Sequence, residues 1–111
     1  MSCSCSNVYR TVRKILLSKE REFQVAYGAG PAEVLKLKLK ILTELKAVKY
    51  DTCTCFVGEQ LRQLQVLVDD FHRKQAAFKR DTVENQYTRE VERRFDKVHK
   101  IMYTIGGISP E

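Results

Sequence analysis

The apolar residues of segment 57–78 recur at steps of three, four and seven positions. The stripe consists of Val57, Leu61, Leu64, Val68, Phe71 and Phe78. This spacing follows the 3.6-residue turn of an α-helix rather than the two-residue period of a strand. The sequence therefore predicts a long helix over 57–80 with a heptad-like apolar face.

A second apolar stripe follows residue 81. It predicts a helix over 82–105, with Asp81 or Thr82 as the N-cap. Whether 57–80 and 82–105 form one continuous helix or two stays open at this point. One continuous helix would be too long and thin to close its own core, and it would favour a dimer.

The N-terminal part of the chain predicts an amphipathic helix over 8–27. Its apolar residues fall on one side and its basic residues on the other, and Ser6 or Asn7 can cap its start. The sequence GAGP at 28–31 then ends the helix, because its glycines permit a left-handed turn. Pro31 suits the first position of a new helix.

The segment after Pro31 reads VLKLKLKILTELKAVK, and its first half alternates apolar residues with lysine. Alternation is typical of a strand, but the length, the abundance of Leu, Lys, Glu and Ala and the scarcity of β-branched residues favour a helix. Lys38 would then lie inside the apolar arc, as Lys19 does on the preceding helix. Each lysine can snorkel at the core edge or contact an acidic partner. The next segment, 50–58, fits a short strand, a loop or a weak link in one long helix.

Together the stripes predict an all-α fold in one domain, since 111 residues suffice for one modest core. We expect a small antiparallel bundle of three or four amphipathic helices, which is dimeric. The helical domain is expected to cover 8–105, between a flexible tail at 1–7 and a C-terminal tail at 106–111. No signal-peptide pattern and no membrane-spanning apolar run is present, so we expect a cytoplasmic or nuclear protein without membrane contact.

The formal net charge of +6 comes entirely from the first half of the chain. Residues 1–50 carry ten Lys and Arg against four acidic residues, whereas 51–111 carry ten of each. Such asymmetry indicates an anionic partner, although a solvated basic face also explains it. The basic residues expected to form one cationic strip on the first two helices are Arg10, Arg13, Lys14, Arg21, Lys36 and Lys40.

A strip of this kind could follow several backbone phosphates without reading bases. The sequence therefore predicts a non-enzymatic nucleic-acid-binding protein that recognises duplex RNA, or else DNA, by backbone and shape. The alternative is a helical protein–protein interaction adaptor, or a subunit of a larger complex, whose basic half contacts an acidic protein.

The four cysteines form two Cys-x-Cys pairs, Cys3 with Cys5 and Cys53 with Cys55. Structural zinc ligands are usually spaced two to four residues apart, so this spacing argues against a zinc site. Buried packing is the ordinary role of Cys53 and Cys55. In the predicted tail, Cys3 and Cys5 could instead be S-acylated beside the basic helix.

Two Asp-x-x-His pairs, Asp69 with His72 and Asp96 with His99, resemble half of a dinuclear metal site in a helical bundle. Such sites also require inward glutamates from other helices, so we predict no metal. No nucleophile has a credible base and oxyanion arrangement, and no phosphate-binding glycine loop follows a strand. The sequence accordingly predicts no catalytic residues and no cofactor.

Overall fold

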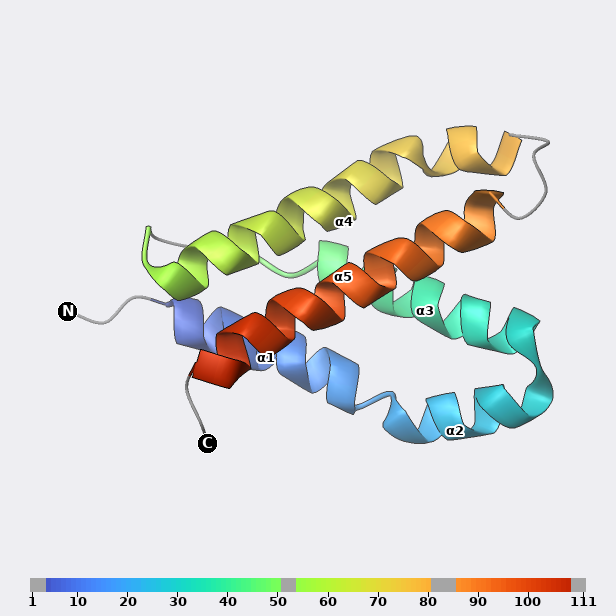
Figure 1. Cartoon of the computed structure of the whole chain (residues 1–111), viewed down its shortest axis with the longest axis horizontal. Coiled ribbons are helices and arrows are strands. Elements are labelled where there is room, and N and C mark those ends of the chain that lie inside the picture. The colour runs from blue at the N-terminus through green and yellow to red at the C-terminus, as the bar shows by residue number, and fades with distance from the viewer. Residues whose placement is uncertain (1–3, 51–53, 81–85, 109–111) are drawn as a thin grey trace.

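A computed structural model describes residues 4–50, 54–80 and 86–108 of the chain. These residues are helical apart from short connections, which confirms the predicted all-α class for the described part (Figure 1). The helices are α1 (Cys5–Leu17), α2 (Glu20–Ala29), α3 (Pro31–Lys46), α4 (Phe56–Arg80) and α5 (Gln86–Ile108).

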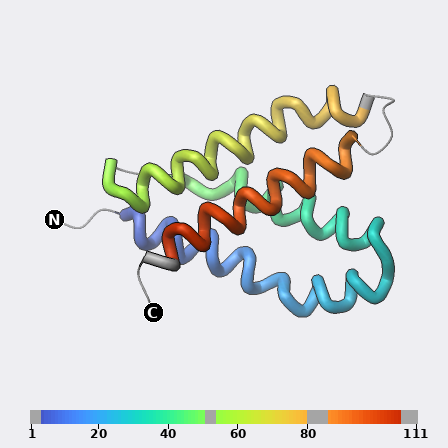
Figure 2. Tube along the Cα trace, viewed as in Figure 1, coloured from blue at the N-terminus to red at the C-terminus, as the bar shows by residue number. Residues whose placement is uncertain are grey.

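The two longest helices, α4 and α5, fold back on each other and run side by side in opposite directions (Figure 2). α4 and α5 are therefore two separate helices. The one continuous helix that would have favoured a dimer does not form. The predicted caps Asp81 and Thr82 lie outside the described residues. α2 and α3 form a second hairpin, and α3 also packs against α4 and α5 while α1 packs against α3 and α4. The molecule measures 50 × 29 × 21 Å.

The single helix predicted over 8–27 is wrong, because Ser18 and Lys19 separate α1 from α2. The Ser18 hydroxyl donates a hydrogen bond to the carbonyl of Ile15 at 2.9 Å. The N–H of Lys19 bonds to the carbonyl of Leu16, three residues back, at 3.3 Å. A serine hydroxyl that competes for backbone carbonyls, together with a tightened last turn, is a common way for a helix to end.

Helices extend into both segments that were predicted as tails, 1–7 and 106–111. α1 already begins at Cys5, whose side chain is buried, and the residue before it is Ser4 rather than the predicted cap Ser6 or Asn7. At the other end, α5 continues through Gly106 to Ile108. A Cβ on Gly106 would stand 2.8 Å from the Tyr9 hydroxyl oxygen, so the glycine leaves room for the end of the Tyr9 side chain beside α5.

The alternating lysine segment is helical, as predicted, and Pro31 occupies its first turn. Gly30 precedes it with a φ of 120°, a backbone conformation that glycine adopts readily. α3 ends at Lys46 and α4 begins at Phe56, so the last three residues of segment 50–58 are helical and its other described residues lie in the connection between the two helices. Residues 51–53 of this segment lie outside the described residues.

The core consists mainly of residues from the predicted stripes, together with Cys5 from the segment predicted as a tail. Its largest fully buried side chains come from α1, α3, α4 and α5, and they are Val12, Ile41, Leu42, Leu45, Leu61, Leu64, Val68, Phe71, Val91, Val98 and Cys5. α2 contributes the partly buried Phe23 to this cluster. α2 therefore lies at the edge of the core, where grooves can open on its two sides.

None of the described helices combines the length and the apolar character needed to cross a bilayer.

Candidate functional site

The two lysines expected on apolar arcs are paired within the chain. Lys38 Nζ lies 3.8 Å from Glu92 Oε2 and 5.3 Å from the centre of the Phe95 ring. Lys19 Nζ lies 3.2 Å from Glu44 Oε2, and each lysine side chain is only 13% exposed. Both lysines lie at the core edge with their stems covered, so neither requires an acidic partner from outside.

A buried arginine, which the sequence reasoning missed, links α4 to α5. Arg94 is 3% exposed, and its Nη2 donates to Asp70 Oδ2 at 2.9 Å. Its Nη1 donates to Glu90, one turn earlier on α5. The guanidinium carbon lies 5.6 Å from the ring centre of Phe71 and 5.3 Å from that of Phe78. The available signal was the position of Arg94 in the apolar stripe of α5, three residues after Val91 and four before Val98.

This pairing controls the protonation of Asp70. The hydrogen bond from Arg94, with smaller contributions from Lys74 and Arg73, lowers the pKa of Asp70 to about 2. Because the folded-state pKa lies below the unfolded one, the stabilisation is present above about pH 4 and is lost as pH falls towards 2.

We therefore expect Arg94→Met to raise the pKa of Asp70 towards its ordinary value, as measured by NMR titration of the Asp70 side-chain carboxyl. The stability of the variant should also fall less steeply below about pH 4. Arg93→Met is the control, because Arg93 pairs with Glu90 and not with Asp70. An unchanged Asp70 pKa in Arg94→Met would contradict the assignment.

Three of the six predicted cationic residues come together at a groove between α2 and α3. Arg21, Lys36 and Lys40 border this groove, which has a volume of about 550 Å³. The remaining lining side chains are two carboxylates and four small or apolar groups, and they are Glu22, Glu33, Val25, Ala26, Ala29 and Leu37. We call this the α2–α3 groove.

The other three predicted residues lie elsewhere, so the structure does not bring the six into one groove. Arg13 lines a different groove, between α1–α2 and α5. Arg10 and Lys14 are exposed on α1, one helical turn apart, and line neither groove. The interruption at Ser18 and Lys19 explains the division, because α2 no longer continues the face of α1.

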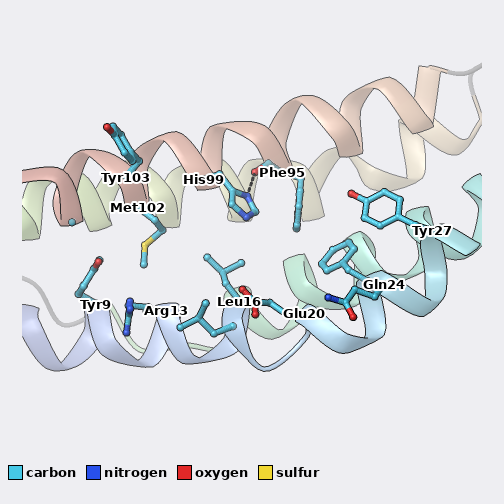
Figure 3. A pocket seen from close by; sticks show the side chains of 13 residues that line it. Tyr9, Arg13, Leu16, Glu20, Gln24, Tyr27, Phe95, His99, Met102 and Tyr103 are labelled. Carbon is cyan, nitrogen blue, oxygen red and sulfur yellow. Dashed lines mark hydrogen bonds between the residues drawn. The ribbon is translucent and has the colours of Figure 1, made fainter. Parts of the chain in front are cut away.

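The second groove is the larger one, with a volume of about 850 Å³. Figure 3 shows that Tyr9, Arg13, Leu16, Glu20 and Gln24 follow one another along α1 and α2. Phe95, His99 and Met102 face them from α5, whereas the Tyr103 side chain points away from α1. His99 Nδ1 lies 3.1 Å from the Phe95 carbonyl oxygen. We call this the α1/α5 groove.

The cysteines of the two Cys-x-Cys pairs lie in different surroundings. Cys5 is buried at the start of α1, so its thiol is not placed for the S-acylation considered above. Cys3 and Cys53 lie outside the described residues, and Cys55 Sγ accepts a hydrogen bond from the Gly58 N–H at 3.3 Å.

In the two Asp-x-x-His pairs, Asp69 and Asp96 are exposed. Nδ1 of His72 lies 2.9 Å from the Val68 carbonyl oxygen, four residues earlier on α4. Nδ1 of His99 lies in the same way beside the Phe95 carbonyl oxygen on α5. Within the described residues, no group of three or more His, Cys, Asp or Glu gathers where a metal could bind.

Comparison with known proteins gives no family for this chain: no family model matches it, and no significantly similar curated protein or solved structure was found. The two grooves and the exposed cationic residues are therefore the features from which a function can be inferred.

Proposed function

We propose that this chain is a non-enzymatic protein-interaction module whose α2–α3 groove holds an acidic amphipathic helix of a partner protein. The observation that supports this proposal most directly is the exposure of an apolar side chain: Val25 is 74% exposed in a groove bordered by three basic side chains. A hydrophobic groove between helices commonly receives the apolar face of another helix. Burial of Val25 would then supply part of the binding energy.

The charges around the groove support an acidic partner. Arg21, Lys36 and Lys40 outnumber the two carboxylates, and one of those carboxylates, Glu33, lies 3.6 Å from Lys36 Nζ. Acidic side chains flanking the apolar face of a helix would pair with these cations while small alanines in the groove allow close approach. Complementary charge of this kind mainly accelerates association and selects the partner.

Duplex nucleic acid, with RNA ahead of DNA, is the second candidate. All six predicted residues are exposed, and Arg10 and Lys14 present two cations on one outer face of α1. Exposed arginine and lysine on a rigid helix can contact successive phosphates. The apolar side chains and carboxylates of the α2–α3 groove favour the protein partner, because a phosphate backbone makes no use of Val25 and is repelled by Glu22.

We also propose that the helices form an antiparallel bundle and that two copies of the chain associate into a homodimer. The protein would be located in the cytoplasm or the nucleus. Leu17, Tyr27 and Tyr103, which are exposed at the α1/α5 groove, support the dimer.

Substitution of Val25 tests the proposed function. The probe is a fluorescently labelled peptide of about 18 residues, designed as a helix with leucine on one face and glutamate flanking it. We expect Val25→Asp to weaken binding of this peptide by about tenfold or more, because apolar burial is lost and a like charge is introduced. Fluorescence anisotropy measures the affinity. Val66→Asp is the matched control, since Val66 is 62% exposed on α4 and lies outside this groove.

A parallel titration with duplex RNA separates the two candidates. If nucleic acid is the partner, log K falls steeply with log salt, by roughly 0.7 to 0.9 per phosphate contacted. Arg10→Glu with Lys14→Glu would then weaken RNA binding more than the control Arg89→Glu with Lys100→Glu, which makes the same charge change at exposed sites on α5. RNA binding of this kind, with equal peptide affinities for wild type and Val25→Asp, would contradict the protein-partner proposal.

A further inference from the structure

We propose that the α1/α5 groove binds an iron porphyrin and that His99 is an axial ligand of its iron. The ligand would lie inside this groove, whereas the dimer proposed above uses the exposed residues at the rim of the groove. The site is also separate from the proposed peptide site, because the α1/α5 groove and the α2–α3 groove share no lining residue.

The first observation is the way in which the His99 ring is held. Its Nδ1 lies 3.1 Å from the carbonyl oxygen of Phe95, four residues earlier on α5. A carbonyl oxygen only accepts hydrogen bonds, so Nδ1 carries the proton in this bond, and Nε2 of the neutral ring keeps its lone pair. Metal-ligating histidines are usually held in this way, because a bond from the second ring nitrogen fixes the tautomer and the orientation of the ring.

The second observation is the position of Nε2. Figure 3 shows the His99 ring pointing from α5 towards α1, into the groove that both helices line. His99 is an exposed residue, and Nε2 has no hydrogen-bond partner among the residues that the structure describes. The lone pair of Nε2 is therefore available to a ligand that enters the groove.

The third observation is the size and lining of the groove. Its volume of about 850 Å³ lies within the roughly 300 to 1,000 Å³ of sites that bind small organic molecules. Apolar side chains line both walls, with Leu16 and Phe23 on α1 and α2 and Phe95 and Met102 on α5. The ring centre of Phe95 lies 5.6 Å from that of Phe23 and 4.6 Å from that of His99. A flat apolar ligand beside His99 would therefore meet a surface that is largely aromatic.

An iron porphyrin fits these observations better than a bare metal ion does. A bare ion usually needs three or four protein ligands, and no group of three His, Cys, Asp or Glu gathers within the described ranges. A porphyrin supplies the equatorial nitrogen ligands itself, so one histidine can hold its iron. A single ligand leaves no spacing pattern in the sequence, which is why the sequence predicted no cofactor.

The groove also suits the two kinds of surface on a porphyrin. Its flat apolar ring would be buried against the aromatic walls, and this burial would supply part of the binding energy. Leu17 and Tyr27 line the groove and remain 46% and 67% exposed, so the groove opens to solvent. The carboxylates of the porphyrin can therefore stay hydrated while the iron reaches His99.

Titration of the full chain with haemin, the ferric iron porphyrin, tests the proposal. We expect the main absorption band of haemin to shift as it binds, and the shift to saturate at one haemin per chain. His99→Gln should remove the shifted band and weaken haemin binding by about tenfold or more, because the bond from iron to imidazole is lost. Free imidazole, added to haemin and the His99→Gly variant, should restore the band because it replaces the missing ligand.

His72→Gln is the matched control. Nδ1 of His72 lies 2.9 Å from the Val68 carbonyl oxygen, but His72 belongs to α4 and does not line the α1/α5 groove. His72→Gln should therefore leave the haemin band and affinity as in the wild type. Metal-free protoporphyrin is the second probe. It has the same flat ring without iron, so wild type and His99→Gln should bind it with equal affinity.

Three results would overturn the proposal. The first is a wild-type chain that shows no saturable binding of haemin. The second is the same band and the same affinity for wild type and His99→Gln, since haemin would then only adsorb to apolar surface. The third is an equal loss of binding in His72→Gln and His99→Gln, which would mean that the groove does not select between the two histidines.

Discussion

Replacing Arg94 with alanine is expected to lower the free energy of unfolding by about 3 kcal/mol, in line with losses seen when one partner of a buried ion pair is removed. The change removes hydrogen bonds to Asp70 and Glu90 and leaves these two carboxylates, on α4 and α5, without the cation between them. It also removes the guanidinium that lies against the rings of Phe71 and Phe78. Urea denaturation followed by circular dichroism measures the loss.

The neighbouring Arg93 provides the control. Its side chain is half exposed and pairs with Glu90 at 2.9 Å on the same helix. Exposed pairs of this kind contribute little, so Arg93→Ala should cost less than about 1 kcal/mol. Equal losses for Arg93→Ala and Arg94→Ala would contradict the view that Arg94 links α4 to α5 from within the core.

Replacing Phe71 with alanine is expected to lower the free energy of unfolding by about 4 kcal/mol, since a fully buried aromatic ring leaves a cavity. Phe71 is 0% exposed, and its ring centre lies 6.2 Å from that of Phe78 and 6.3 Å from that of Tyr87. The loss therefore includes contacts within α4 and contacts from α4 to α5. The same denaturation experiment measures it.

Phe56→Ala, at an exposed position at the start of α4, is the control and should cost less than about 1 kcal/mol. Because Phe71 and Arg94 are in contact, the double variant should lose less than the sum of the two single losses. A loss below about 1 kcal/mol for Phe71→Ala would show that this part of the core does not hold α4 against α5.

The helical class could be predicted because the stripes combine strong periodicity with suitable composition. Leu61, Leu64 and Val68 occupy the core as their spacing predicts. The interruption at Ser18 and Lys19 was missed because it depends on a local competition for backbone carbonyls, which periodicity does not reveal. The extension of α5 past Gly106 was also missed, because glycine is a usual helix end and the sequence alone does not show that α5 continues to Ile108.

The candidate sites were less predictable because they depend on which helices become neighbours. Exposure of the six cationic residues follows from helix periodicity, but their division between two grooves and the outer face of α1 depends on the path of α2. The surroundings of Lys38 likewise depend on tertiary contacts, since Glu92 and Phe95 come from α5. The sequence places Arg94 in an apolar stripe but does not reveal its partner. Asp70 lies on α4, so the pair forms only because α4 and α5 pack together.

The most direct test of the proposed function is to locate the bound acidic peptide by NMR. Amide shifts of the ¹⁵N-labelled chain are followed while the unlabelled peptide is added. The proposal predicts that the largest shift changes fall on Val25, Ala26, Ala29 and Leu37, which line the α2–α3 groove, and that they saturate. Changes confined to α4 and α5, or no saturable change at low salt, would contradict it.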